Sequence, residues 1–190
     1  MNRRFMASTV TVLLLAGIGA MPASAQSNRG RVKTTKTSDS NSYHIWLEKQ
    51  IRHELLMLPY YGVYDNLEFR IDGDRVTLLG QVLRPSTRTD AAKRVKKIEG
   101  VTSVVNKIEA LPASPMDDHL RRRLFRAIYS SAFLNHYAIQ PVPPIHIIVK
   151  NGNVTLAGVV ASEAEKNVAN IKASGVAGTF SVTNQLRVEK

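Results

Sequence analysis

The sequence predicts an α+β fold of two tandem α-β-β-α-β domains, each with two helices packed on one face of a small mixed three-stranded sheet. The first observation behind this prediction is an internal duplication, because residues 71–108 recur as residues 149–186 without a gap. The second is that each copy shows the same succession of helical and strand-like hydrophobic patterns. With 190 residues and 44% hydrophobic content, the chain can bury two small cores.

The repeat is clearest around a strand that ends near a glycine. Residues 73–82 read GDRVTLLGQV, and residues 151–160 read NGNVTLAGVV. Each stretch follows another β-rich run across a turn that contains glycine, which predicts a β-hairpin. Gly80 and Gly158 indicate a bend, or a close backbone approach that leaves no room for a side chain.

A helix and a further strand follow each hairpin. Pro85 suits the first position of the helix in the first copy, and Ser162 with Glu165 forms a capping box in the second. These helices should end near Gly100 and Gly178, and the following strand completes a right-handed parallel unit. Another helix precedes each hairpin, with apolar residues at every fourth position: Leu47, Ile51 and Leu55, then Leu120, Leu124 and Ile128.

The N-terminus, residues 1–25, has the features of a secretory signal peptide. Arg3 and Arg4 precede the apolar run MASTVTVLLLAGIGAM, and small residues up to Ala25 provide a cleavage site. An uncleaved anchor is the alternative, but this interrupted run is short for a span of about 20 residues. We therefore expect a periplasmic or secreted protein after cleavage near Ala25.

The remaining boundaries follow from composition. Residues 26–41 are basic and polar and should form a disordered leader, since they cannot bury enough apolar surface to fold. The predicted domains are residues 42–111 and 117–190, joined by a linker at residues 112–116. The second copy has about five extra residues before its hairpin, within residues 136–144, where prolines predict an extended, non-helical segment.

The sequence shows no constellation typical of an enzyme. No histidines are paired at a metal-ligand spacing, and the cluster Asp117-Asp118-His119 suits the start of a helix, where acidic groups complement the dipole. His146 is expected on the solvent side of its strand. The tetrapeptide GVAG at residues 175–178 matches an RNA-binding loop, but glycines that end a helix explain it better. We predict no catalytic residue, metal, cofactor, small-molecule substrate or nucleic-acid partner.

The most informative candidate site is the first helix of the second copy. When its apolar stripe faces inward, Arg122, Arg126, Tyr129 and Phe133 collect on the outward face, with Arg123 at the edge. Arginines interleaved with aromatic rings suit a lipid head-group surface. The alternative is that this outward face packs against the other domain or a neighbouring sheet.

Trp46 occupies the corresponding outward face in the first copy. The net charge of +11 also favours anionic partners. However, about 1 kcal/mol for each of four arginines gives only about 4 kcal/mol, or roughly millimolar affinity. Stable binding therefore needs aromatic insertion, help from the basic leader or avidity. Basic residues within 88–97 should form an ordinary solvated helix face.

The order of elements, the GxVTLxG motif after each hairpin turn and the V.N.I/L pattern of each last strand resemble the BON domain, named for bacterial OsmY and nodulation proteins. The resemblance implies an envelope protein that binds surfaces, commonly phospholipid membranes, with roles in envelope integrity or osmotic stress. Some two-domain relatives are lipoproteins, whereas this chain has no cysteine to acylate.

Our leading hypothesis is a non-enzymatic protein that binds anionic phospholipid surfaces. The alternative is a periplasmic protein-protein interaction or chaperone-like module that uses the same apolar faces on polypeptide partners. An enzyme is a distant third possibility, which a hydrolytic activity dependent on Asp118 or His119 would revive.

Overall fold

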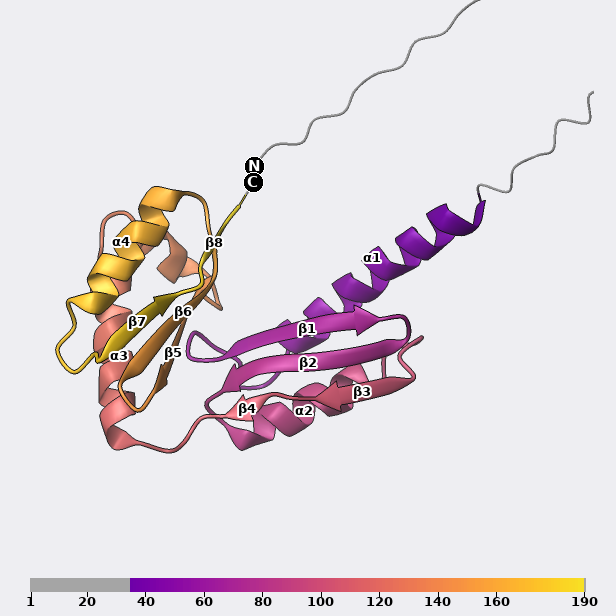
Figure 1. The fold of residues 1–190 in the computed structure, drawn as a ribbon, viewed down its shortest axis with the longest axis horizontal. Coiled ribbons are helices and arrows are strands. Elements are labelled where there is room, and N and C mark those ends of the chain that lie inside the picture. Colours follow the sequence, from indigo (N-terminus) through magenta and orange to yellow (C-terminus); the bar gives the residue numbers. More distant parts are fainter. Residues whose placement is uncertain (1–34, 190) are drawn as a thin grey trace, which may run out of the picture. The chain divides into compact units, whose positions relative to one another are not determined.

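The computed structural model describes residues 35–189, with side chains from Ser42 onward, and residues 36–190 form one compact unit. Within it the same order of elements occurs twice (Figure 1). The predicted signal peptide and residues 26–34 lie outside the described residues. The first half, residues 35–111, contains α1 (Thr35–Leu56), β1 (Asn66–Asp72), β2 (Arg75–Val82), α2 (Pro85–Val95), β3 (Ser103–Asn106) and β4 (Glu109–Ala110).

The second half, residues 112–189, repeats this order with one added turn of 3-10 helix, η1. It contains α3 (Pro115–Tyr129), η1 (Asn135–Ile139), β5 (Ile145–Lys150), β6 (Asn153–Val160), α4 (Glu163–Ser174), β7 (Ser181–Asn184) and β8 (Arg187–Val188). The predicted fold class is confirmed: each half has two helices and a mixed sheet.

In both sheets the hairpin pairs antiparallel and the last segment pairs parallel. In the first half, β1 pairs with β2, and β3 and β4 both pair with the other side of β2. The second half has the same arrangement of β5, β6, β7 and β8. The third position of each sheet is therefore a strand with an interruption, and β1 and β5 are edge strands.

The registers of the two hairpins agree with the repeat offset of 78 residues found in the sequence. Phe69 lies opposite Leu78 in the first half, and Ile147 lies opposite Leu156 in the second. Every position of β1 thus has an equivalent in the second half, which allows the two edges to be compared residue by residue.

Gly80 and Gly158 are required by a close backbone approach, as predicted. Both have positive φ, 108° and 115°. A Cβ atom at Gly80 would collide with the carbonyl oxygen of Asn66, and one at Gly158 with that of Pro144. These carbonyls belong to the start of the partner strand, so the glycines let the two strands cross closely at that end.

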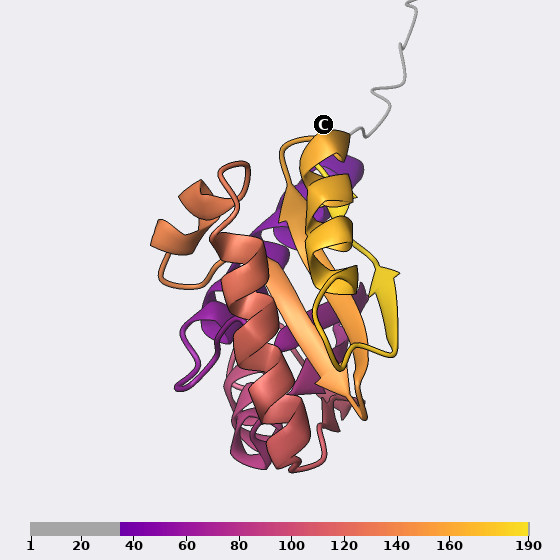
Figure 2. The same cartoon turned by 90° about the vertical axis from the view of Figure 1, so that its left-hand side faces the viewer.

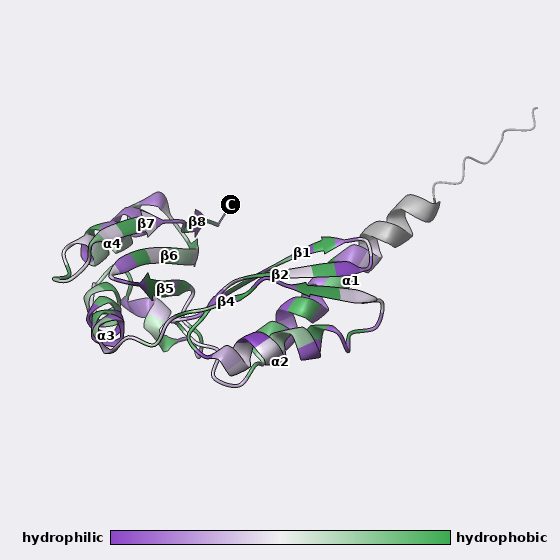
Figure 3. Cartoon of the chain, turned by 60° about the horizontal axis from the view of Figure 1, so that its bottom comes forward, coloured by the Kyte–Doolittle hydropathy of each residue, from purple (hydrophilic) through white to green (hydrophobic). Residues whose placement is uncertain are grey.

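Each half encloses its own core between helices and sheet. Figure 2 shows α3 and α4 on the same face of the second sheet, and both helices contact strands of that sheet. Figure 3 shows hydrophobic residues recurring along the helices and strands. The first core includes Leu47, Ile51, Leu55, Val76, Leu78, Ala91 and Val95, and the second includes Leu120, Leu124, Ile128, Ile147, Val154, Leu156 and Ala169.

The identical asparagines Asn106 and Asn184 bridge the interruption in each last strand. The Asn106 side chain donates to the carbonyl of Arg88 in α2 and accepts from the amide of Ile108. Asn184 makes the same pair of bonds, with Lys166 of α4 and with Leu186. Each asparagine therefore ties the end of a strand to the crossover helix.

Two predictions about local structure need correction. Helix α1 begins at Thr35, so residues 35–41 are helical rather than part of a disordered leader; extending a packed helix avoids the cost of a new nucleus. Helix α3 begins at Pro115, capped by the Ser114 side chain, within the segment predicted as the linker. Within the insertion, residues 135–139 form the 3-10 helix η1, and only the proline-containing part that follows is non-helical.

Tyr137 explains why η1 forms. Its buried hydroxyl donates to Glu165 at 2.9 Å and accepts from the amide of Ala161 at 2.9 Å. Glu165 is also the capping-box residue of α4, which confirms the predicted cap with Ser162. The turn is thus held by a long-range contact that its local sequence does not reveal. None of the helices in residues 35–189 is long and apolar enough to cross a membrane.

Candidate functional site

Helix α3 exposes three arginines. Arg122, Arg123 and Arg126 are all exposed, and none of them forms a salt bridge within residues 42–189. Arg122 contacts the His119 ring, with 2.9 Å between Nη2 and Nδ1. One face of α3 therefore carries cationic charge that no described carboxylate neutralises.

The fourth arginine of α3 has a different role. Arg121 is only 1% exposed. Its Nη2 donates to the carbonyl of Val149 at 2.6 Å, and its Nη1 donates to Asp118. Arg121 therefore belongs to the interior of the second half, and only three arginines of this helix are available to an anionic partner.

Tyr129 does not lie on the outward face, which corrects the prediction. It is 5% exposed, and its hydroxyl donates to the carbonyl of Ile145 at 2.7 Å. Burial raises the pKa of the Tyr129 hydroxyl above its ordinary value. The projection failed because the buried arc of α3 also includes Asp117 and Arg121, and so its centre is displaced toward Tyr129.

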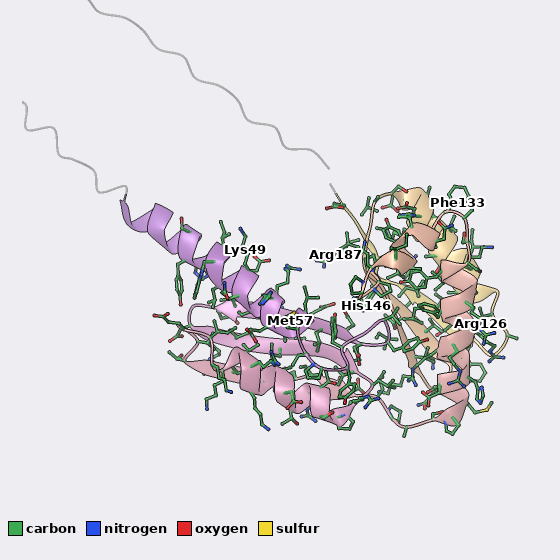
Figure 4. All side chains as sticks on the ribbon, turned by 180° about the vertical axis from the view of Figure 1, so that it is seen from behind. Lys49, Met57, Arg126, Phe133, His146 and Arg187 are labelled. Carbon is green, nitrogen blue, oxygen red and sulfur yellow. The ribbon has the colours of Figure 1, made fainter. Side chains whose placement is uncertain are left out.

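Three exposed apolar residues of the second half lie near the ends of α3, while Ile139 in η1 and Ile171 in α4 are exposed elsewhere. Phe133, in the turn after the helix, is 64% exposed, and Figure 4 shows it with Arg126 on the side of this half formed by α3. Met116, in the first turn of α3, and Phe180 are also exposed. The Phe180 ring lies against Gly152, whose amide donates to Asp117 of α3. Sequence reasoning missed Met116 and Phe180.

Trp46 belongs to a different surface. It lies on α1, is 40% exposed and stacks on Tyr43 with 6.0 Å between ring centroids. It borders a small hollow of about 220 Å³ that is also lined by Arg94 and Lys97. The structure therefore groups the α3 arginines with one another and leaves Trp46 apart from them.

The cluster at the start of α3 stabilises the fold. The Asp117 carboxylate is buried and accepts from the amides of Asn151 and Gly152, at 2.8 and 2.9 Å. It thereby fixes the turn between β5 and β6. Among the residues that the structure describes, no group of His, Cys, Asp and Glu side chains could hold a metal ion.

A larger groove of about 770 Å³ lies along β1. Its walls come from one face of α1 and from β1 itself, and the second half contributes residues near His146 and Arg187 (Figure 4). The apolar part of the lining includes Leu55, Leu56, Leu67, Phe69 and Ile71. Sequence analysis did not predict this groove, because it depends on how α1 lies over the sheet edge.

His146 lies at the inner end of this groove and not on an open solvent face, contrary to the prediction. Its ring is 5.7 Å from that of Tyr61. Burial lowers the pKa of His146 and raises the pKa of Tyr61 to about 12. The helix-free face of the second sheet is therefore covered at this point by residues of the first half.

The family model of the BON domain matches the chain twice, over residues 46–112 and 117–190. The chain belongs to the BON domain family. The predicted tandem pair is thus confirmed, and BON domains are known for binding phospholipids and for association with the cell envelope. A search of curated proteins found no match.

The comparison with solved structures matched this BON protein to two of them. Both are of CdsD, a structural protein of the type III secretion system of Chlamydia trachomatis, one of them of its C-terminal domain. Each is 14% identical and covers 76% of this chain, and the matches cover 98% and 93% of those chains. The TM-scores are 0.28 and 0.27, so the similarity carries no inference about partners.

Proposed function

We propose that this BON protein is a non-enzymatic, exported protein that attaches reversibly to anionic phospholipid surfaces through α3 and thereby supports envelope integrity or tolerance of osmotic stress. The observation that carries the proposal is the face formed by Arg122, Arg123 and Arg126, which are exposed and unpaired within residues 42–189. Phosphate groups bind guanidinium groups well, since both can form two parallel hydrogen bonds. The predicted signal peptide would place the protein in the periplasm or outside the cell.

The energetics require both charge and apolar insertion. Three arginines at about 1 kcal/mol each supply about 3 kcal/mol. Burying the Phe133 side chain in the membrane interface adds about 1.5–3 kcal/mol. The sum of about 4.5–6 kcal/mol corresponds to a dissociation constant of roughly 0.04–0.5 mM, which suits reversible attachment. Phe133 should therefore contribute about as much as the charges do.

Flotation with liposomes tests the charge component. We expect the mature protein to float with vesicles that contain anionic lipid at low salt, and less at physiological salt, because exposed charges are screened over about 8 Å there. The double variant Arg122→Glu, Arg126→Glu should lose flotation. The matched control is Lys93→Glu, Lys96→Glu, which makes the same charge change on exposed positions at the C-terminal end of α2. Equal losses in both variants would show that only net charge matters and would contradict a site on α3.

The same assay tests the apolar component. Phe133→Ala should weaken vesicle binding by about tenfold or more, because the ring no longer leaves water. Ile45→Ala removes an exposed apolar side chain from α1 and should leave binding unchanged. If the wild-type protein floats under no condition, the lipid proposal fails and a polypeptide partner becomes the leading alternative.

A further inference from the structure

The two edge strands, β1 and β5, occupy equivalent places in the repeat but differ in whether their outer edge is occupied. In an antiparallel pair, alternate residues direct their backbone N–H and C=O groups away from the partner strand. In β5 these residues are Ile145, Ile147 and Val149. The β1 residues at the offset of 78 are Leu67, Phe69 and Ile71.

The outer edge of β5 is closed by three groups of this chain. The Ile147 amide donates to the carbonyl of Val63 at 2.7 Å, so the turn that contains Val63 and Tyr64 already lies beside this strand. The carbonyl of Ile145 accepts from the Tyr129 hydroxyl, and the carbonyl of Val149 accepts from Arg121. Each of these three residues thus has a hydrogen bond on the edge that faces away from β6.

The outer edge of β1 lacks the same closure because the sequence differs at the equivalent helix positions. At the offset of 73 residues that relates α1 to α3, Glu48 replaces Arg121 and Leu56 replaces Tyr129. Neither a carboxylate nor an isobutyl side chain can donate a hydrogen bond to a carbonyl oxygen. The Phe69 and Ile71 amides also have no hydrogen-bond acceptor within residues 42–189 beyond the β1–β2 ladder.

The groove of about 770 Å³ lies where a further strand would pair with β1. Its lining includes Glu48 and Leu56, the two helix residues that replace the closing side chains of the second half. It also includes Leu67, Phe69 and Ile71, the β1 residues whose backbone groups point away from β2. The carboxylates and guanidinium groups that line the groove cancel in net charge: Arg52 pairs with Glu48 at 2.9 Å and lies over the Phe69 ring, and Glu68 and Arg187 carry opposite charges. An occupant therefore meets backbone groups and apolar side chains more than net charge.

We infer that the open edge of β1 is a strand-addition site, at which an extended segment of a partner polypeptide pairs with Phe69, Ile71 and the Leu67 carbonyl beneath α1. The carbonyls of the segment take the place that the Val63 carbonyl has on β5, and its amides take the place of the Tyr129 hydroxyl and the Arg121 guanidinium group. Its alternate side chains point toward α1 and should be apolar, because Leu55 and Leu56 line that wall. This site is separate from the arginine face of α3, so either proposal can fail without the other.

The test uses a soluble peptide of alternating valine and threonine, with lysine at both ends, added to the mature protein and followed by amide hydrogen exchange in NMR. In the free protein, the Phe69 and Ile71 amides should exchange rapidly, while the Arg70 amide, which points to β2, is protected. The peptide should slow exchange at Phe69 and Ile71 by at least tenfold. Protection of both amides in the peptide-free protein at every concentration, or no change on adding peptide, would overturn the proposal.

Two controls isolate backbone pairing. A peptide that is N-methylated at alternate residues on its pairing edge keeps the side chains but loses the donors, and it should not bind. The double variant Glu48→Arg, Leu56→Tyr transplants the closure found on β5 and should weaken peptide binding by at least tenfold. Lys49→Arg, His53→Tyr makes similar changes at exposed positions of α1 outside the groove and should bind normally.

The controls can also contradict the proposal. Equal binding of the methylated peptide, or equal binding by the Glu48→Arg, Leu56→Tyr variant, would show that the peptide does not pair with β1. If protection of Phe69 and Ile71 instead rises with protein concentration in the absence of peptide, the occupant is a second copy of this chain and the assignment to a partner polypeptide is wrong.

Discussion

Arg121 shows how a charged side chain can be part of a small core. The guanidinium group is buried, and it joins α3 to the last outward-facing carbonyl of β5 while pairing with Asp118. A buried charge is tolerated only when its hydrogen bonds are made within the protein. Arg121 therefore stabilises the second half, while its neighbours Arg122 and Arg123 face outward.

We expect Arg121→Met to lower the free energy of unfolding by about 2–4 kcal/mol. The variant keeps an unbranched side chain but leaves the Val149 carbonyl without its donor and Asp118 without its partner. Urea denaturation measures this change. Arg122→Met is the matched control on the exposed face and should change stability by less than about 0.5 kcal/mol. Similar values for both variants would contradict the structural role of Arg121.

Tyr61 should make stability depend on pH in the alkaline range. Burial, followed by the nearby Asp65 charge, raises its pKa to about 12, above the ordinary value of 10.0. Between these values the unfolded chain loses the phenolic proton before the folded chain does, so stability is complete below pH 10 and falls as the pH rises toward 12.

Denaturation at pH 9 and at pH 11.5 measures this effect against Tyr61→Phe. The phenylalanine variant has no proton to lose and should show a smaller decrease than the wild-type protein. Tyr43→Phe is the control at an exposed tyrosine. An unchanged pH dependence in Tyr61→Phe would show that Tyr61 titrates normally in the folded protein.

At the scale of single elements, the two hairpins are the most constrained parts of the fold. Gly80→Ala and Gly158→Ala should each destabilise the protein by about 1–3 kcal/mol or more, because alanine is strained at positive φ and its Cβ meets a carbonyl oxygen. Gly62→Ala is the matched control, since a Cβ there meets nothing within 4 Å. Thermal unfolding distinguishes the three, and a Gly80→Ala protein as stable as Gly62→Ala would contradict the close approach.

The elements that sequence patterns predicted well are those determined by local chemistry. Turn residues place the hairpins, Pro85 begins α2, and Ser162 with Glu165 caps α4, because each of these signals acts within a few residues. The internal duplication supported these assignments independently, because the same order of helices and strands had to fit the sequences of both copies. The split in each last strand was not predicted, because it depends on contacts of Asn106 and Asn184 with distant helices.

The candidate site was predicted less well than the fold. A helical projection assigns a direction to each residue but not the width of the buried arc, and so Tyr129 was placed outward although its hydroxyl reaches Ile145. Exposure of Arg122, Arg126 and Phe133 agrees with the prediction. The groove along β1 could not be predicted from the sequence, because it depends on how α1 lies over the outer edge of β1. The groups that close the equivalent edge of β5 come from segments distant in the sequence.

At the scale of the whole molecule, the two sheets differ on the face that their helices leave uncovered. Ile148 points to this face in the second half and is 4% exposed, yet it lies outside the core cluster beneath α3 and α4. Its equivalent in the first half is the exposed Arg70. The strands β1 and β5 are in contact, and Lys150 pairs with Glu109. The apolar face of the second sheet is therefore the one that the first half covers.

Replacing Ile148 by the residue of the first copy tests this contact. Ile148→Arg should uncouple the halves and change a single unfolding transition into two, since a buried unpaired charge is costly. Calorimetry detects the change. Lys150→Asp also introduces the first-copy residue but removes only an exposed ion pair, so it should alter stability by less than about 1 kcal/mol. A single transition in the Ile148→Arg protein would contradict an interface at this face.

The contact of Val63 and Tyr64 with the second core has a consequence for the order of folding events during synthesis. A chain that emerges from its N-terminus completes the first core at Ile108 before the second half follows. The Val63 carbonyl and the Tyr64 ring are then already in place for Ile147 and Phe125. The folded first half thus acts as a template on which the second half assembles, and fragments that begin within the second half should fold poorly.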